Sequence, residues 1–351
     1  MFSRLVGNKR AQEILRRMLA AGRVAGALLF VGEEGVGKKQ FALELARALN
    51  CLKPRGVEAC GECSSCVRAG KFVYPAADDK EARGRVVWSE HGDVGVVLPY
   101  NRSILVDAAR DLERETNFRP YEGRARVLII DEADRMNKNA ANALLKTLEE
   151  PHPTSHIILV TSRPASILPT IRSRCQTIRF APLAPSEIEE YLVKHRRRSG
   201  EEARLAAHFS RGRLAQALEL NLDTYRAERD LMLNVLDALT PQTDRSRLLR
   251  ASEELSDAKR KDDYEPRLDL LETLVRDLWL LTLDADRTTE ATLVNQDLRE
   301  RLTRMSAGLE SRRAARWLTG IEELRARLAV NINRRVATDA LLLSMEQAGK
   351  S

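Results

Sequence analysis

A short apolar run that leads into a glycine-rich turn and then a helix constrains this chain more than any other feature. Residues Ala27–Val31 are wholly apolar, as expected of a strand buried in a parallel sheet. The turn Gly32-Glu-Glu-Gly-Val-Gly-Lys38 fits G-x-x-x-x-G-K, and apolar side chains follow at helical spacing over 38–49. We call Gly32–Lys38 the phosphate loop, because such a unit cradles phosphate with backbone N–H groups and a lysine. A plain strand-to-helix turn is the alternative.

The residue after this loop departs from the pattern of a working nucleotide hydrolase. A Ser or Thr hydroxyl there ligates Mg²⁺, whereas this chain has Lys39, whose ammonium repels a cation. The loop is therefore expected to hold nucleotide or phosphate without positioning Mg²⁺ for hydrolysis, and ATP with Mg²⁺ is left open as a cofactor. The predicted nucleotide contacts in this segment are Gly32, Gly35, Val36, Gly37, Lys38 and Lys39.

A second motif places acids at the tip of another buried strand. Val127–Ile130 is apolar and is followed directly by Asp131 and Glu132. In a parallel sheet this tip lies beside the phosphate loop, where Asp131 could help hold Mg²⁺ and Glu132 could polarise the attacking water. An acidic turn that caps a helix is the alternative.

Four of the five cysteines fall within sixteen residues. Cys51, Cys60, Cys63 and Cys66 have the spacing C-x8-C-x2-C-x2-C, and no histidine lies nearby. Tight C-x2-C steps bring thiolates onto one tetrahedral ion, so the pattern predicts a closed, structural zinc site. An iron–sulfur cluster and four unrelated thiols are the alternatives.

The rest of the chain indicates its class and organisation. A third apolar run, Ile157–Val160, alternates with helical segments, which predicts a parallel α/β sheet. Residues 70–101 are expected to be irregular with one hairpin, 239–246 to be a linker, and everything after 181 to be helical. No run of about 18 apolar residues and no signal-peptide core occurs, so we expect a cytoplasmic chain without membrane contact. The net charge of +7 allows contact with nucleic acid but does not establish it.

In this order the motifs resemble the clamp-loader branch of the AAA+ ATPases. Further stretches that resemble this family are 120–136, 142–151, 168–176 with its Ser-Arg-Cys motif, and 331–343. The resemblance implies an AAA+ P-loop domain over 1–180 with a zinc module at 51–66, a helical lid over 181–240, and an all-α collar over 241–351.

The resemblance also implies roles for single residues. Thr161 or Ser162 matches sensor 1, a polar group near the γ-phosphate. Arg174 matches the arginine finger, which projects into the nucleotide site of the neighbouring subunit; a plain surface arginine is the alternative. Gln216 stands where sensor 2 usually supplies an arginine, and a neutral amide cannot stabilise phosphate charge as a guanidinium does.

The implied function is that of a subunit in a five-membered loader that opens the sliding clamp and places it on primer–template DNA. The implied partners are the gamma/tau and delta subunits of the loader, the beta clamp, and DNA through the assembled complex. As part of a DNA-directed DNA polymerase holoenzyme, the chain is expected to have little or no ATPase activity of its own. The alternatives are a gamma/tau-type ATPase motor and a zinc-containing DNA-binding regulator.

Overall fold

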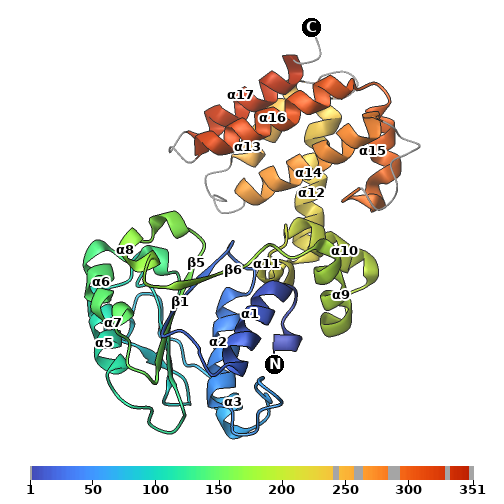
Figure 1. The fold of residues 1–351 in the computed structure, drawn as a ribbon. Coiled ribbons are helices and arrows are strands. Elements are labelled where there is room, and N and C mark those ends of the chain that lie inside the picture. Colours follow the sequence, from blue (N-terminus) through green and yellow to red (C-terminus); the bar gives the residue numbers. More distant parts are fainter. Residues whose placement is uncertain (1, 240–244, 257–263, 284–292, 329–332, 348–351) are drawn as a thin grey trace. The chain divides into compact units, whose positions relative to one another are not determined.

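The computed structural model describes residues 2–239, 245–256, 264–283, 293–328 and 333–347 (Figure 1). The chain divides into two compact units, of which the first comprises 1–196 with 210–218 and the second 197–209 with 219–351. The predicted linker at 239–246 and the domain boundary at 240 fall largely outside the described residues, as does the start of the stretch 331–343. The three-domain division stays a prediction.

The first unit is built on a six-stranded sheet in the order β2-β3-β4-β5-β1-β6. Its strands are β1 (Ala27–Val31), β2 (Val87–Trp88), β3 (Val94–Val97), β4 (Arg126–Ile130), β5 (Ser155–Thr161) and β6 (Gln176–Arg179). Neighbouring strands are parallel except β2, which pairs antiparallel with β3. The α/β class and the hairpin within 70–101 are therefore confirmed, but the hairpin makes the sheet mixed rather than wholly parallel.

Helices cover both faces of this sheet (Figure 1). On one face, α1 (Lys9–Ala20) and α2 (Lys38–Asn50) share a core with β1, and Phe30, Phe41 and Phe180 meet there at ring-centroid distances of 5.0 to 5.1 Å. On the other face lie α5 (Val106–Thr116), α6 (Lys138–Ala143), α7 (Leu145–Glu149) and α8 (Pro169–Arg172). Of these, α6 and α7 follow each other directly and are separated by the single residue Leu144.

Shorter elements complete the first unit. They are η1 (Phe2–Arg4), α3 (Ser64–Arg68), α4 (Lys80–Arg83), η2 (Ala133–Arg135), η3 (Pro164–Ser166), α9 (Pro185–Arg196) and α11 (Leu214–Glu219), whose last residue lies past the unit boundary at 218. The start of α11 returns to the phosphate loop, because the Ala215 N–H donates to the Gly35 carbonyl at 3.3 Å. This contact brings a segment far along the sequence to the carboxyl edge of the sheet.

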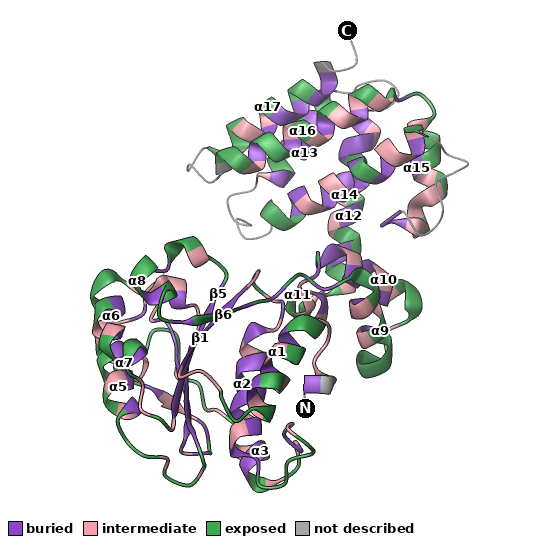
Figure 2. Ribbon diagram, in the orientation of Figure 1, coloured by how far each residue is buried: buried purple, intermediate pink, exposed green. Residues whose placement is uncertain are grey.

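All regular elements that the structure describes in the second unit are helices. Its helices are α10 (Gly200–Phe209), α12 (Leu222–Leu239), α13 (Arg245–Leu255), α14 (Tyr264–Leu283), η6 (Gln296–Leu298), α15 (Arg299–Ser306), α16 (Ser311–Leu328) and α17 (Arg334–Gln347). Helix α14 is central, because it packs against α12, α15 and α16. Buried residues line the inner faces of these helices (Figure 2), and Trp317 is the largest fully buried side chain. Among the described helices, none has the length and apolar character that crossing a membrane requires.

Candidate nucleotide site, arginine corner and cysteine cluster

The phosphate loop joins β1 to α2 and turns through two glycines in the left-handed region. Gly35 has φ 82° and Gly37 has φ 93°, which side chains other than glycine rarely adopt. Val36 between them is buried, and Gly32 has no room for a side chain because the Phe180 carbonyl lies against it. The loop therefore has the strand–turn–helix context that its sequence predicts.

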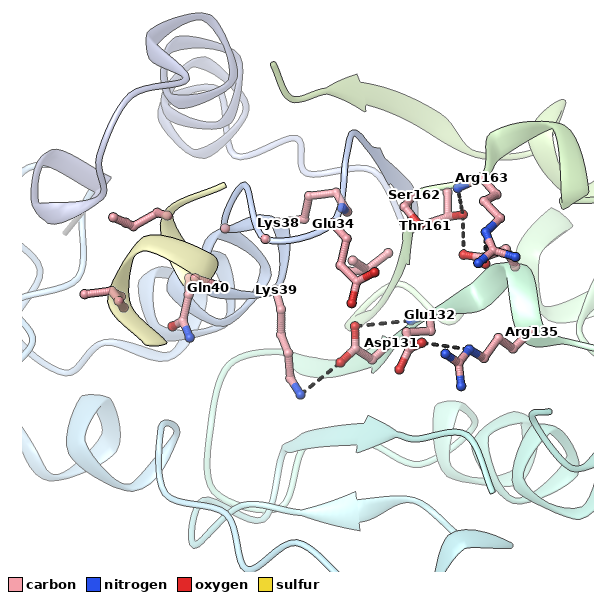
Figure 3. Close-up of a pocket in the computed structure, with 17 residues that line it drawn as sticks. Glu34, Lys38, Lys39, Gln40, Asp131, Glu132, Arg135, Thr161, Ser162 and Arg163 are labelled. Carbon is pink, nitrogen blue, oxygen red and sulfur yellow. Dashed lines mark hydrogen bonds and ion pairs between the residues drawn. The ribbon is translucent and has the colours of Figure 1, made fainter. Parts of the chain in front are cut away.

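A cavity of about 360 Å³ opens at the carboxyl edge of the sheet (Figure 3). It is lined by Glu34, Gly35, Gly37, Lys38, Lys39 and Gln40 of the loop and α2; Asp131, Glu132, Asp134 and Arg135 after β4; Val160, Thr161, Ser162 and Arg163 of β5 and its end; and Leu214, Ala215 and Leu218 of α11. Most of the predicted nucleotide contacts thus share one cavity. Gly32, Val36 and Arg174 do not line it. Sequence reasoning missed Glu34, Asp134, Arg135 and Arg163.

Lys38 is almost fully buried and its ammonium group is turned toward the loop itself. Nζ donates hydrogen bonds to the carbonyl oxygens of Gly32 at 2.7 Å and Glu33 at 2.5 Å. Burial lowers the pKa of Lys38, while nearby carboxylates, Asp131 foremost, act in the opposite direction. Because an ammonium has three donors, one remains for a ligand.

Lys39 points toward Asp131, and its ammonium takes the place that a divalent cation would need. Lys39 Nζ lies 3.0 Å from Asp131 Oδ2 (Figure 3). It also lies 4.9 Å from the centre of the Tyr74 ring. A Mg²⁺ ion in a phosphate-loop site is held by a hydroxyl after the loop lysine and by the carboxylate at the strand tip. The first group is missing and the second is engaged, so the residues do not fit Mg²⁺.

Two further acids of the cavity, Glu132 and Asp134, also have internal partners. Glu132 has a left-handed backbone with φ 49°, and its Oε2 lies 2.7 Å from Arg135 Nε. Burial raises the pKa of Glu132, and Arg135 opposes this effect. Of the two sensor candidates, Thr161 is buried and donates its hydroxyl to Asp134 Oδ1 at 2.7 Å, whereas Ser162 is exposed.

Helix α11 brings residues to the cavity, but Gln216, the predicted sensor 2 residue, is not one of them. Leu214, Ala215 and Leu218 line the cavity, and all three side chains are apolar. The buried Oε1 of Gln216 accepts no hydrogen bond from the part of the chain that the structure describes. The sensor 2 role of this helix stays a prediction.

Arg174 lies outside the cavity, just beyond α8. Its Nε and Nη2 donate to Glu149 Oε2 at 3.1 and 2.8 Å, and its Nη1 donates to the Thr170 carbonyl at 3.0 Å. The Arg174 side chain is 32% exposed and that of Glu149 is 58% exposed. These three bonds engage three of the five guanidinium donors. Neighbouring Cys175 is buried, which raises the pKa of its thiol to about 12.

The four predicted cysteine ligands converge on one point at the end of α2 and around α3. Their sulfur atoms all lie within 4.8 Å of one another, with Cys51–Cys63 and Cys60–Cys66 at 4.0 Å. A tetrahedral zinc ion with Zn–S bonds of about 2.3 Å places its sulfur ligands about 3.8 Å apart. The sulfur atoms therefore lie within about 1 Å of the spacing that a zinc ion requires, and the cluster fits zinc.

Backbone N–H groups favour the thiolate form of Cys60 and Cys63, whereas burial raises the pKa of Cys66. The amide of Cys63 donates to Cys60 Sγ at 3.3 Å, and that of Cys66 donates to Cys63 Sγ at 3.5 Å. Hydrogen bonds from Glu62 and Cys63 lower the pKa of Cys60. Burial raises the pKa of Cys63, but backbone donors outweigh it and bring that pKa to about 6. Thiolates are the form that binds metal.

Comparison with known proteins agrees with these features. The model of a family described as DNA polymerase III, delta subunit, matches residues 7–184, about half of the chain. The delta prime subunit of DNA polymerase III from Bacillus subtilis is 29% identical over 96% of both chains, and that from Pseudomonas aeruginosa is 35% identical over 43% of this chain and 42% of its own. A gamma/tau subunit from Mycobacterium tuberculosis is 34% identical over 55% of this chain but only 31% of its own. With half of its length matched by the family model and nearly all of it aligned with a delta prime subunit, the chain belongs to the DNA polymerase III delta-subunit family.

Proposed function

We propose that this chain is a clamp-loader subunit that completes a neighbour's ATP site through Arg174 and hydrolyses little ATP itself. In this role it assembles with gamma/tau and delta subunits and assists the loading of the beta clamp onto primer–template DNA. The alignment with a delta prime subunit over nearly the whole chain supports this role more than the shorter gamma/tau alignment supports a motor. A zinc-containing DNA-binding regulator has no comparable support.

The observation that carries the proposal is the position of Arg174. It does not line the phosphate-loop cavity of its own chain, and its guanidinium is held at the surface by Glu149 and the Thr170 carbonyl. Phosphoryl transfer spreads negative charge over equatorial oxygens, and a planar guanidinium can pair with two of them. Two donors of Arg174 remain for that purpose. The Arg174 guanidinium can therefore contact a neighbouring subunit instead of the cavity of its own chain.

The phosphate-loop cavity supports the second part of the proposal, that this chain hydrolyses little ATP itself. Lys39 engages Asp131, the carboxylate that a catalytic Mg²⁺ would need, and the α11 residues at the cavity are apolar. Glu132, which would otherwise polarise water, is paired with Arg135. A chain with these contacts is suited to be a rigid partner in ATP hydrolysis, with the cysteine cluster as a zinc-bound structural module.

Substitution of Arg174 in a reconstituted loader tests this role. Arg174→Ala should leave assembly intact and should lower ATP hydrolysis stimulated by DNA and clamp, together with clamp loading. A finger supplied in trans contributes about 10³–10⁵ in rate at its own site, and the loss for the whole complex is smaller because other sites still turn over. Lys should not restore the rate, since it offers a point charge instead of a planar fork.

Arg172→Ala is the matched control, because this arginine is exposed two positions earlier and does not line the cavity. It should leave ATP hydrolysis and clamp loading at the wild-type rate. Gel filtration should show the same assembled complex for both variants. Equal rates for Arg174→Ala and Arg172→Ala in an assembled loader would show that Arg174 is only a surface residue.

A further inference from the structure

The contacts of Lys39 raise the question of what this cavity binds. A subunit without ATPase activity could lose the cavity altogether, yet it is open, with a volume of about 360 Å³. Pockets of a few hundred cubic ångströms are typical of small-ligand sites. The loop that borders it keeps both glycines in the left-handed conformation and keeps the buried Lys38. The polyphosphate-binding part of the site is thus retained, while the metal-binding part is altered.

The charges in the cavity are arranged around an internal cation. Four acids line the cavity. Three of them contact a basic or hydroxyl group of this chain, Asp131 with Lys39, Glu132 with Arg135, and Asp134 with Thr161, and the fourth, Glu34, is exposed. Adding Mg²⁺ would require Asp131 to release Lys39 and would bring two cations together. Removing Lys39 would leave Asp131 facing any bound phosphate with an unbalanced negative charge.

An ammonium at this position can do part of what Mg²⁺ does. It has three donors, so Lys39 can keep its bond to Asp131 and still donate to phosphate oxygens. Unlike Mg²⁺, it does not demand an octahedral set of oxygen ligands. It supplies the attraction that holds a polyphosphate but does not supply a metal-bound geometry for hydrolysis. Val160, Leu214 and Leu218 add apolar surface that suits the nucleoside part of a ligand.

We infer that Lys39 is a built-in cation and that this cavity binds a nucleoside di- or triphosphate in its metal-free form. The ligand then acts as a fixed structural part between the phosphate loop and α11, which already contact each other through Gly35 and Ala215. Failure of this inference would leave the proposed role of Arg174 untouched, because Arg174 lies outside the cavity.

Calorimetric titration of the purified full chain with ATP tests the inference in two buffers, one with EDTA and one with excess Mg²⁺. The wild-type chain should bind ATP at least as tightly with EDTA as with Mg²⁺, because the Mg²⁺ complex carries less negative charge. Lys39→Thr should bind about tenfold more weakly in EDTA, the loss expected for one charge-assisted hydrogen bond, and Mg²⁺ should now tighten binding. Lys39→Arg should keep the wild-type preference, because it keeps the charge.

Lys71→Thr is the matched control, since Lys71 forms an exposed pair with Glu90 at 3.4 Å and does not line the cavity. It should bind ATP as the wild-type chain does, and circular dichroism should show that every variant is folded. Absence of ATP binding to the wild-type chain in both buffers would overturn the inference. Wild-type ATP binding that becomes tighter with Mg²⁺ would also overturn it. So would pyrophosphate that binds as tightly as ATP, because the nucleoside would then make no contribution to binding.

Discussion

The cysteine cluster and the phosphate-loop cavity both gather groups that bind cations, but they balance their charges in opposite ways. In the cluster, four sulfur atoms face one another and accept hydrogen bonds from backbone N–H groups such as those of Cys63 and Cys66. In the cavity, three of the four carboxylates lie within 4.0 Å of a basic side chain of the same chain, Asp131 beside Lys39, Glu132 beside Arg135 and Asp134 beside Arg163. The cluster thus has a geometry that fits a zinc ion, whereas the cavity contains positive charge from the chain itself.

This difference shows that ligand-type residues alone do not identify a metal site. Asp131 and Glu132 have the right chemistry and the right place at a strand tip, yet a single lysine one position after the phosphate loop changes what they can bind. The cysteines have no such competitor among the contacts of their sulfur atoms that the structure describes. The following predictions test this comparison, beginning with the largest effect.

The largest expected effect is loss of zinc from the cysteine cluster. The wild-type chain should contain about one zinc ion per molecule, because four thiolates close the coordination sphere. Cys63→Ser should lose the metal and increase amide hydrogen exchange over 51–66, while exchange in β1, β4 and β5 stays slow. Structural zinc contributes on the order of 10 kcal/mol to such small modules, so the local change should be large.

Cys175→Ser serves as the control for the cluster, because Cys175 is buried in a different core of the same unit. This variant should keep its zinc even if it melts at a lower temperature. Substoichiometric zinc in wild-type protein purified without chelators, or an iron-type visible absorption band, would contradict the zinc assignment.

The next effect concerns ATP hydrolysis by the isolated chain. The isolated chain should hydrolyse ATP far more slowly than about 1 s⁻¹, the lower end of ordinary phosphoryl-transfer enzymes. Lys39→Thr should not restore turnover, because the α11 residues that line the cavity, Leu214, Ala215 and Leu218, supply no cation. Steady-state ATP turnover by pure wild-type protein at about 1 s⁻¹ or faster would show that the cavity does position Mg²⁺ for hydrolysis. It would then be a metal site like the cysteine cluster.

A smaller effect is expected in folding stability. The side chains of Lys39 and Asp131 are 29% and 19% exposed, so their pairing should contribute about 0.5–1 kcal/mol to the free energy of unfolding. A double-mutant cycle with Lys39→Met and Asp131→Asn, followed by urea unfolding, measures this coupling. The exposed pair Lys71–Glu90 is the comparison and should show coupling near zero. Equal coupling in the two pairs would mean that Lys39 has no special place in the cavity.

Much of the first unit could be predicted from sequence, because its signals are local. The phosphate loop, β1, β4 and β5 are buried apolar runs followed by residues with distinct chemistry, and the cysteine spacing directly indicates a common ion. Strand β6 was missed, because only one of its four residues is buried and it lies at the edge of the sheet. The hairpin of β2 and β3 was expected within 70–101 but without bounds, because β3 is only four residues long and contains Gly95.

The partners of the site residues could not be predicted, because they depend on tertiary contacts. Lys39 was recognised as unable to ligate Mg²⁺, but its bond to Asp131 joins residues 92 positions apart. Residue 215 and not 216 lines the cavity, and its N–H contacts the Gly35 carbonyl, which is far away in the sequence. The bond from Arg174 likewise joins a residue just beyond α8 to Glu149 of α7.

The smallest expected change in stability concerns Glu149, which positions Arg174. Glu149→Gln should lower the free energy of unfolding by less than about 1 kcal/mol, because the pair is largely exposed. The effect of Glu149→Gln should appear instead in the reconstituted loader. Without the Glu149 carboxylate, the Arg174 guanidinium is held less firmly in the orientation that contacts the neighbour's phosphate. ATP hydrolysis should therefore fall, but by less than in Arg174→Ala, and Glu149→Asp should recover little because its shorter side chain does not reach. Glu150→Gln, at the adjacent exposed position, should change neither quantity. If Glu149→Gln and Glu150→Gln gave the same ATPase rate as the wild-type loader, the contact between Glu149 and Arg174 would have no part in positioning the finger.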